Sequence, residues 1–397
     1  MNLRLRHAGA FGLIACATAL GLAGTDLVLP AVPSLALSLS ACGRGSAQEA
    51  QLVLAAFVAG TAVGLLAFGA VGERWSHRRL LIGSLFAYAL TSLLCMFSPS
   101  LDVMIGLRFL QGAAGSAPAV FAPGIIRTLY GDDRAVAAFG LLGSIEAAVP
   151  ALAPIAGFAL FQSFGWTSSF ILIAFLSASV AIAILIAGSH LPVPAERPRG
   201  GSYGALLLRR RFVGQAGSHA LTLGALLIVV FAAPTTFANA MGGSVRDFIV
   251  MQIGGVSTFM VTANGSARLL PRYGAPILIM TGTVMSAVGA SAMLAYALVG
   301  GGSIAAVSLM FLLLNGGLGL RGPAGFHAAI VAAGGDDARG AALIVVAILL
   351  VTAFGTAAVA PFITYGLVAM ATGATLAAWP PLPSCHGIEK PGDRATA

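Results

Sequence analysis

The sequence has few charged residues and few cysteines. Charged residues make up 9% of its 397 positions, whereas 58% of the residues are hydrophobic. A soluble globular domain carries about a quarter charged residues, so this composition excludes one and indicates a bundle of membrane helices. The cysteines do not have the spacing of metal ligands, and they imply no disulfide framework. They are Cys16, Cys42, Cys95 and Cys385.

Signatures of enzymes are also missing. The chain contains neither HExxH nor GxxxxGK[ST], so a metalloprotease and an ATP-driven pump would both lack essential parts. We therefore expect no catalytic residue, no metal and no cofactor. The first apolar run is too long for a signal peptide and lacks a small-residue cleavage site, so we expect it to be a membrane helix.

Twelve apolar segments are present, and they approach or exceed the ~20 residues that cross a bilayer. The polar stretch 193–211 divides them six and six, and its proline, glycine and arginine residues are typical of a surface linker. We therefore expect an all-α membrane protein with six-helix bundles at 1–190 and 213–384, a cytoplasmic linker at 191–212 and a cytoplasmic tail at 385–397. The expected segments are 8–36, 49–71, 80–98, 102–126, 135–161, 167–190, 213–240, 248–267, 275–299, 303–330, 340–360 and 362–382.

The basic residues predict the orientation of the chain. If the amino terminus is cytoplasmic, 17 of the 21 lysine and arginine residues fall on the inner side. Two others, Arg44 and Arg246, fall outside, and Arg108 and Arg321 lie within spans. The excess of positive charge on cytoplasmic loops therefore predicts that both termini are cytoplasmic. The same distribution accounts for the net charge of +8, so we expect no nucleic-acid partner.

One acidic residue lies inside the first apolar segment. Asp26 falls within Gly12–Pro33, where a charge costs roughly 2.5–3.5 kcal/mol on insertion scales, so its default interpretation is functional. Pro30 and Pro33 follow and are expected to bend or end the helix. Counted along the helix axes, Asp26 and Arg108 lie at comparable depths, so they can form an ion pair if their helices adjoin. Such a pair would serve proton coupling or would only fix packing.

Three other polar residues within spans are candidate substrate contacts. Glu146 lies near the midplane, and it would carry a proton, bind a cationic drug or remain a protonated, hydrogen-bonded carboxyl group. Gln111 follows the first buried arginine by one turn and can line the cavity. Arg321 would contact a substrate or an anion, or would extend toward the cytoplasmic surface, which we slightly favour. His219 and His327 are expected to be interfacial residues with satisfied hydrogen bonds.

Four motifs occur in an order that resembles a known family. Thr25–Pro33 (TDLVLPAVP) resembles TDxYLPAxP, and Gly69–Arg78 (GAVGERWSHR) stands where the family has GxxxDRxGRR. Leu107–Gly112 (LRFLQG) contains RxxQG, and Val149–Gly157 (VPALAPIAG) resembles the antiporter motif of the fifth span. On these residues the chain resembles the major facilitator superfamily, its twelve-span drug:proton antiporter group, and within that group the bicyclomycin and chloramphenicol exporter (Bcr/CflA-type) branch.

The resemblance implies a proton-coupled exporter of small hydrophobic or amphipathic compounds. Phenicol-type antibiotics are the sharpest guess for the substrate, and alternating access in a bacterial inner membrane is the expected mechanism. A proton gradient would drive transport, the bilayer would be the surroundings, and a monomer is the expected state. The resemblance assigns proton coupling to Asp26 and Arg108. It assigns gating to Gly69, Glu73, Arg74 and Arg78, with Arg127 as the partner of Glu73, and a bend in the fifth span to Pro150, Pro154 and Gly157.

Two other functions stay open. The first is export of an endogenous metabolite, such as an amino acid, a sugar or a pathway product. A broad drug range against a single polar substrate would separate this function from multidrug efflux. The second is a membrane sensor or assembly partner that transports nothing. The absence of a sizeable soluble domain and the presence of both Asp26 and Arg108 count against this second alternative.

Overall fold

The computed structural model describes residues 3–39, 47–187 and 201–379, in which every regular element is a helix. The expected tail at 385–397 and the first part of the expected linker, 191–200, lie outside these ranges, as do Cys42 and Cys385. The chain forms two compact units. The first unit comprises Met1–Ser202 and Ala333–Val346, and the second comprises Tyr203–Ala332 and Ala347–Ala397.

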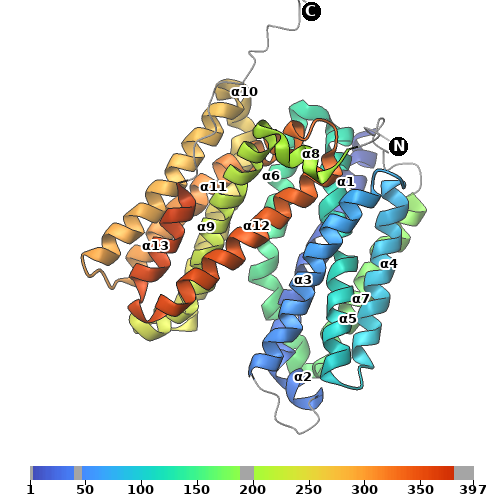
Figure 1. The fold of residues 1–397 in the computed structure, drawn as a ribbon, viewed down its shortest axis with the longest axis horizontal. Helices are drawn as coiled ribbons and strands as arrows, with labels where there is room; N and C mark the ends of the chain where they lie inside the picture. Colours follow the sequence, from blue (N-terminus) through green and yellow to red (C-terminus); the bar gives the residue numbers. More distant parts are fainter. Residues whose placement is uncertain (1–2, 40–46, 188–200, 380–397) are drawn as a thin grey trace, which may run out of the picture. The chain divides into compact units, whose positions relative to one another are not determined.

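The first unit is a bundle of long helices. Within it α3 lies alongside α5, α4 lies alongside α7, and α1 packs on α6 (Figure 1). Its elements are α1 (Leu3–Asp26), the 3₁₀ turn η1 (Leu29–Ala31), α2 (Val32–Leu39), α3 (Ala47–Val71), α4 (His77–Met96), α5 (Leu101–Gly115), α6 (Ala117–Phe164) and α7 (Thr167–Ala187).

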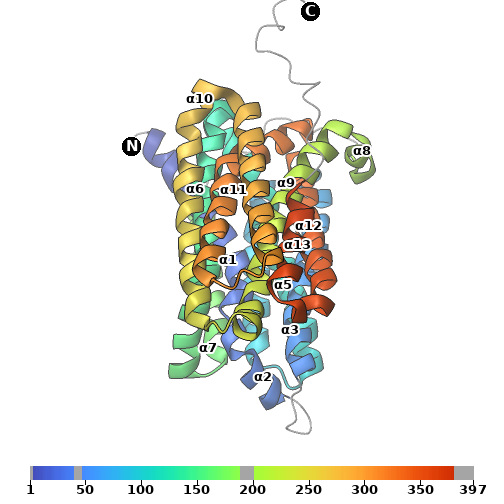
Figure 2. The same ribbon diagram turned by 90° about the vertical axis from the view of Figure 1, so that its left-hand side faces the viewer.

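The second unit is also a bundle of long helices. Here α10 packs along α11, and α13 lies alongside α9 (Figure 2). The helix α12 begins in the first unit and continues into the second. The elements are α8 (Tyr203–Leu208), α9 (Arg210–Ala240), α10 (Val245–Leu298), α11 (Ile304–Ala332), α12 (Asp337–Val359), the 3₁₀ helix η3 (Ala360–Tyr365) and α13 (Leu367–Ala378).

The helices account for the twelve predicted crossings. Nine helical stretches in the described ranges are long and apolar enough to span a membrane. Two of them hold two crossings each, because the chain turns at Gly131 (φ 69°) and at Gly274 (φ 79°), in a backbone region that glycine adopts without strain. The shorter apolar helix α13 completes the set. The chain is therefore a multi-pass membrane protein.

The predicted effect of the two prolines on the first span is confirmed. The helix α1 ends at Asp26, and the chain continues through η1, which contains Pro30, into α2. Pro30 has no N–H to donate to the carbonyl of Asp26, so the regular hydrogen-bond pattern cannot pass this point. The end of α1 therefore lies among other helices, with its last carbonyl groups available to them.

Glycines bring α3 and α5 into backbone contact. A Cβ atom added at Gly60 would overlap the carbonyl oxygen of Phe109, and one added at Gly112 would overlap the carbonyl oxygen of Phe57. The hydroxyl of Thr61 also donates to the carbonyl of Gly112 at 3.4 Å. The hydrophobic effect does not drive helices together within a membrane. Close packing at small residues such as these contributes to helix association instead.

We predict that Gly112→Ala destabilises the protein by about 1–3 kcal/mol, because the added methyl group must push two backbones apart. The measurement is the thermal melting temperature of the purified protein in detergent. The matched control is Gly106→Ala on the same helix, where no atom lies within 4 Å of the added carbon. This control should melt at or above the wild-type temperature, because alanine is the better helix former. Equal melting of the two variants would contradict the close-contact explanation.

Candidate functional site

A buried arginine organises the centre of the first unit. Arg108 on α5 is 0% exposed. Its Nη1 donates to the carbonyl oxygen of Gly24 at 3.0 Å and to Oε1 of Gln111 at 2.6 Å. The amide nitrogen of Gln111 in turn donates to the hydroxyl of Ser92 on α4 at 2.7 Å. Arg108 and Gln111, both predicted from the sequence, therefore form one hydrogen-bonded chain that joins α1, α4 and α5.

The carbonyl that receives Arg108 is available because α1 ends there. In a continuing helix the N–H of Val28 would bond to the carbonyl of Gly24. It bonds instead to the carbonyl of Thr25 at 3.2 Å, which leaves the Gly24 oxygen free. The carboxyl end of a helix carries partial negative charge, so a cation at this position is stabilised.

Aromatic rings cover the remaining face of the guanidinium group. The Cζ atom of Arg108 lies 4.4 Å from the ring centre of Phe57 and 5.8 Å from that of Phe170. Contacts of this kind contribute about 0.5–2 kcal/mol, with the larger values in sites away from water. Among the described residues, Nε and Nη2 of Arg108 have no hydrogen-bond partner.

Asp26 lies near this group without joining it. Its side chain is half-buried, and no ion pair between Asp26 and Arg108 is present among the described residues. The reason lies in helix geometry, because Arg108 bonds to the backbone at Gly24, and side chains two positions apart on a helix point in different directions. Comparable depth in the membrane therefore does not bring the two charges together.

The fifth-span motif packs against the residue that follows Asp26. A Cβ atom at Gly157 would overlap the carbonyl oxygen of Leu27, so α6 touches the backbone at this point. The hydroxyl of Ser169 on α7 donates to the same carbonyl at 2.9 Å. Pro150 and Pro154 lie inside α6, one and two turns before Gly157. These three motif residues therefore lie on the helix that supports the end of α1.

Glu146 lies on α6, and its partner is on α1. The hydroxyl of Thr18 lies within hydrogen-bond reach of the Glu146 carboxyl group. That hydroxyl also donates to the carbonyl of Ala15 at 3.0 Å. A threonine hydroxyl has one hydrogen and two lone pairs, so Thr18 can accept from a protonated carboxyl group while it donates to Ala15. It can also turn to donate to an ionised carboxylate, so the site accommodates both states of Glu146.

Arg321 belongs to the second unit, and the expectation that it extends to the cytoplasmic surface is wrong. Its side chain is 0% exposed and bonds to α9, where Nη1 donates to the Ser218 carbonyl at 2.9 Å and to the Thr222 hydroxyl. His219 was expected at an interface but is 7% exposed and lies beside Arg321. Counting residues gave the position of Arg321 along the helix, but its direction depends on the polar groups of α9.

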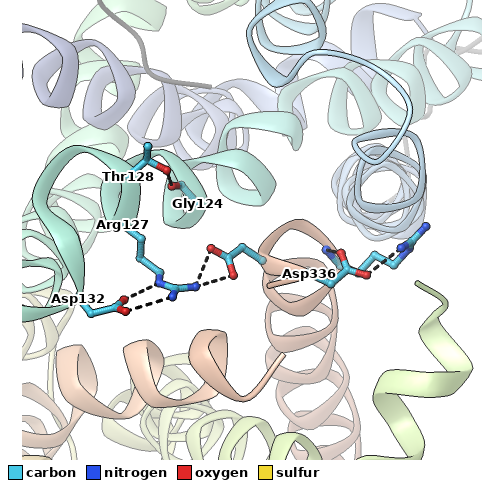
Figure 3. A network of polar contacts seen from close by, with 7 residues as sticks. Gly124, Arg127, Thr128, Asp132 and Asp336 are labelled. Carbon is cyan, nitrogen blue, oxygen red and sulfur yellow. Dashed lines mark hydrogen bonds and ion pairs between the residues drawn. The ribbon is translucent and has the colours of Figure 1, made fainter. Parts of the chain in front are cut away.

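Ion pairs join the start of α12 to the turn after α3 and to Arg127 of α6, and Figure 3 shows the contacts of Arg127 and of Asp336. Glu73 pairs with Arg339, which also bonds to Asp336 at 2.7 Å. Arg127, expected to be the partner of Glu73, bonds instead to Asp132 at 2.8 Å and to Asp337 at 2.6 Å. Local charge decides this outcome, because the two acids beside Arg127 occupy its donors and leave Glu73 to Arg339.

The other residues of this turn have separate contacts. Gly69 is buried near the end of α3, whereas Arg74 is exposed. Arg78 donates to the carbonyl of Leu185 on α7 at 3.0 Å. Ser76, which stands where the family has glycine, caps α4 by accepting from the N–H of Arg79.

Sequence reasoning missed the acids that complete this network. A signal for them exists, because the string Gly-Asp-Asp occurs twice, at 131–133 and at 335–337. Each copy precedes a membrane helix and supplies an aspartate to an ion pair. Recognition of this repeat would have drawn attention to 335–339 as the counterpart of 131–134.

Long apolar helices in two units, with buried charges on several of them, define a membrane transporter fold. The model of the Major Facilitator Superfamily matches residues 14–360, and the chain belongs to that family of transporters. It is not an enzyme. The string GGSYG at 200–204 has the spacing of the hydrolase motif GxSxG, but Gly200 and the residues before it lie outside the described ranges, so the assignment rests on the family match.

Curated bacterial relatives match about three fifths of their own length. A chloramphenicol resistance protein of Pseudomonas aeruginosa is 28% identical over 65% of this chain and 61% of that protein. The uncharacterized MFS-type transporter YdgK of Bacillus subtilis is 30% identical over 62% of each chain. The multidrug resistance protein MdtL of Salmonella paratyphi C is 26% identical over 57% of this chain and 58% of that protein.

Solved structures share the fold over nearly the whole chain. The transporter FucP in its outward conformation superposes with a TM-score of 0.70 at 16% identity, over 93% of this chain and 97% of that one. The proton:xylose symporter XylE gives 0.72 at 13% identity, over 95% of each chain. At these identities the likeness concerns the fold alone.

We predict that Glu73 is energetically coupled to Arg339 and not to Arg127. A double-mutant cycle of Glu73→Gln with Arg339→Gln should give a coupling of about 0.5–3 kcal/mol, because the two side chains are in contact. The same cycle with Arg127→Gln should be additive within about 0.5 kcal/mol. The measurement is the unfolding free energy in mixed detergent micelles. A larger coupling to Arg127 would restore the partner expected from the family resemblance.

Proposed function

We propose that this transporter exports small hydrophobic or amphipathic compounds in exchange for protons, and that phenicol-type antibiotics are among its substrates. The observation that carries the proposal is the pair of carboxyl groups, Asp26 and Glu146, positioned within the membrane-spanning part of one unit and free of arginine partners among the described residues. The names of the relatives support drug efflux, and the four motifs support the Bcr/CflA-type branch.

Both carboxyl groups are linked to α1. Asp26 is its last residue, and Glu146 lies within reach of Thr18, eight residues earlier, which is about 12 Å along a helix. A carboxyl group carries a proton across a cycle only if both of its charge states are accommodated. Thr18 can hydrogen-bond to either charge state of Glu146. Asp26 is not held in a permanent ion pair with Arg108. This arrangement disfavours a purely structural role for Asp26.

Arg108 then acts as a fixed cation near the end of α1. Its charge favours ionisation of nearby acids without neutralising them permanently. Gln111 holds one of its donors, so the guanidinium group stays in place when a proton arrives or leaves. We assign proton coupling to Asp26 with Arg108, and a proton or cationic-substrate role to Glu146. Gln111 and Arg321 are the further candidates for substrate contact.

The ion pairs around Glu73 and Arg127 are the proposed gate. Partly buried pairs with good geometry hold one conformation, and their separation would accompany the other in an alternating-access cycle. We further propose cytoplasmic termini, a bacterial inner membrane, a monomer, and six-helix bundles at 1–190 and 213–384. The distribution of arginines supports the orientation.

We predict that chloramphenicol or a similar compound releases protons in everted vesicles that contain the wild-type protein. The measurement is recovery of a fluorescent pH-gradient dye when each compound of a panel is added. Asp26→Asn should reduce the recovery to the level of empty vesicles, because an amide cannot carry the proton. The matched control is Asp102→Asn, which alters an exposed acid at the start of α5 and should behave as wild type.

Each other result has a definite meaning. If Asp26→Asn behaves as wild type and Glu146→Gln is silent, the proton is carried by Glu146 and not by Asp26. If both variants behave as wild type, proton coupling by these acids is wrong. If the wild type responds to no drug but responds to amino acids or sugars, the protein exports an endogenous metabolite.

A further inference from the structure

Arg321 is a buried cation without an acidic partner in the described part of its unit. The described part of the second unit contains one acidic side chain, Asp247, which is half-buried at the start of α10 and is bonded to Ser244. A buried charge without a partner is strongly destabilising because its lost hydration is not compensated. An anion bound next to Arg321 would compensate its charge.

The neutral groups around Arg321 accept hydrogen bonds from only some of its nitrogens. Nη1 donates to the Ser218 carbonyl and to the Thr222 hydroxyl, and Nη2 donates to the Ser218 hydroxyl at 3.2 Å. Nε has no partner among the described residues. Arg108 in the first unit lies over aromatic rings, but no ring in the described second unit covers Arg321. The two buried arginines therefore differ in their surroundings, which are aromatic for Arg108 and polar for Arg321.

A second unpartnered nitrogen lies beside this group. His219 follows Ser218 on α9 and is buried, and its Nδ1 has no partner among the described residues. Its ring centre lies 5.5 Å from that of Phe326, which holds the imidazole from one side. With its hydrogen on Nδ1, a neutral histidine donates at that atom.

Nitrogen atoms of both residues lie beside Gly325. A Cβ atom built on Gly325 would lie 3.3 Å from Nη2 of Arg321, 3.6 Å from its Nε and 3.6 Å from Nδ1 of His219. These nitrogens are the nearest neighbours of that position, and a methyl group there would be in tight contact with Nη2. Nitrogens from two helices, of which Nε and Nδ1 have no partner among the described residues, therefore converge beside Gly325.

We propose that Arg321, His219 and the glycine face at Gly325 form a binding site for one negatively charged acceptor atom, either a chloride ion or a carboxylate oxygen of a transported compound. Charge-assisted hydrogen bonds from a guanidinium group to such acceptors are about twice as strong as neutral ones. The carboxylate source rests on the proposed export function, because it names an anionic compound as substrate. The chloride source does not depend on that function.

The test is a thermal melting titration of the full-length protein in detergent. Sodium chloride is added to a chloride-free buffer, and in separate samples benzoate is compared with benzamide, its uncharged analogue. We expect chloride or benzoate to raise the melting temperature of the wild type in a saturable way. Benzamide should have no effect.

Two glycine variants make the test specific to the site. Gly325→Ala places a methyl group beside the unpartnered Nε and Nδ1 and leaves the bonds from Nη1 to α9 in place, so it should fold and should abolish the saturable rise. Gly322→Ala, on the same helix, meets only a carbon of Phe259 at 3.9 Å and should titrate as wild type. Arg321→Gln should also lose the response, but it is the secondary variant because it can misfold.

The outcomes separate the two sources and the failure of the proposal. A response to chloride alone identifies an ion site, and a response to benzoate alone identifies a contact for anionic substrates. No saturable response in the wild type, or equal responses in wild type and Gly325→Ala, overturns the proposal. Binding is measured here without transport or protons, so this result stands apart from the vesicle experiment.

Discussion

The need to satisfy a buried guanidinium group governs the centre of the first unit. Arg108 is accommodated because α1 ends at Asp26 and releases the carbonyl of Gly24. The helix ends there because Pro30 cannot donate to the backbone. Neighbouring helices hold the same segment, since Tyr88 donates to the carbonyl of Leu20 at 3.1 Å and Ser169 donates to that of Leu27. A change at the end of α1 would therefore disturb four helices and the buried cation together.

Each unit contains a buried arginine, and the two arginines have similar hydrogen-bond partners. In each, an arginine donates to a backbone carbonyl on a neighbouring helix and to a polar side chain, Gln111 for Arg108 and Thr222 for Arg321. Aromatic rings complete the first site, whereas a histidine and a glycine border the second. The guanidinium group of Arg108 is thus stacked on aromatic rings, whereas Nε of Arg321 lies beside an unpartnered histidine nitrogen.

Hydropathy and proline positions were sufficient to predict the helices, because the cost of exposing backbone to lipid permits little else in a membrane. They were insufficient to predict which partner each buried or charged side chain binds. Depth along a helix is a matter of counting residues, but the direction of Arg321 depended on hydroxyl groups of α9, and that of Arg108 on a carbonyl released by a helix end. The partner of Glu73 depended on which arginines were already engaged. Such competition involves residues more than 200 positions apart, and no local pattern records it.

The helix α12, which carries two residues of the proposed gate, belongs to both units. Its first turns, up to Val346, belong to the first unit, where Asp337 and Arg339 pair with Arg127 and Glu73, and from Ala347 the same helix belongs to the second unit. A helix of 23 residues is about 35 Å long and bends little without a proline or a similar defect, and α12 contains none. In the proposed cycle, the separation of these pairs would release one end of a rigid element whose other end is embedded elsewhere.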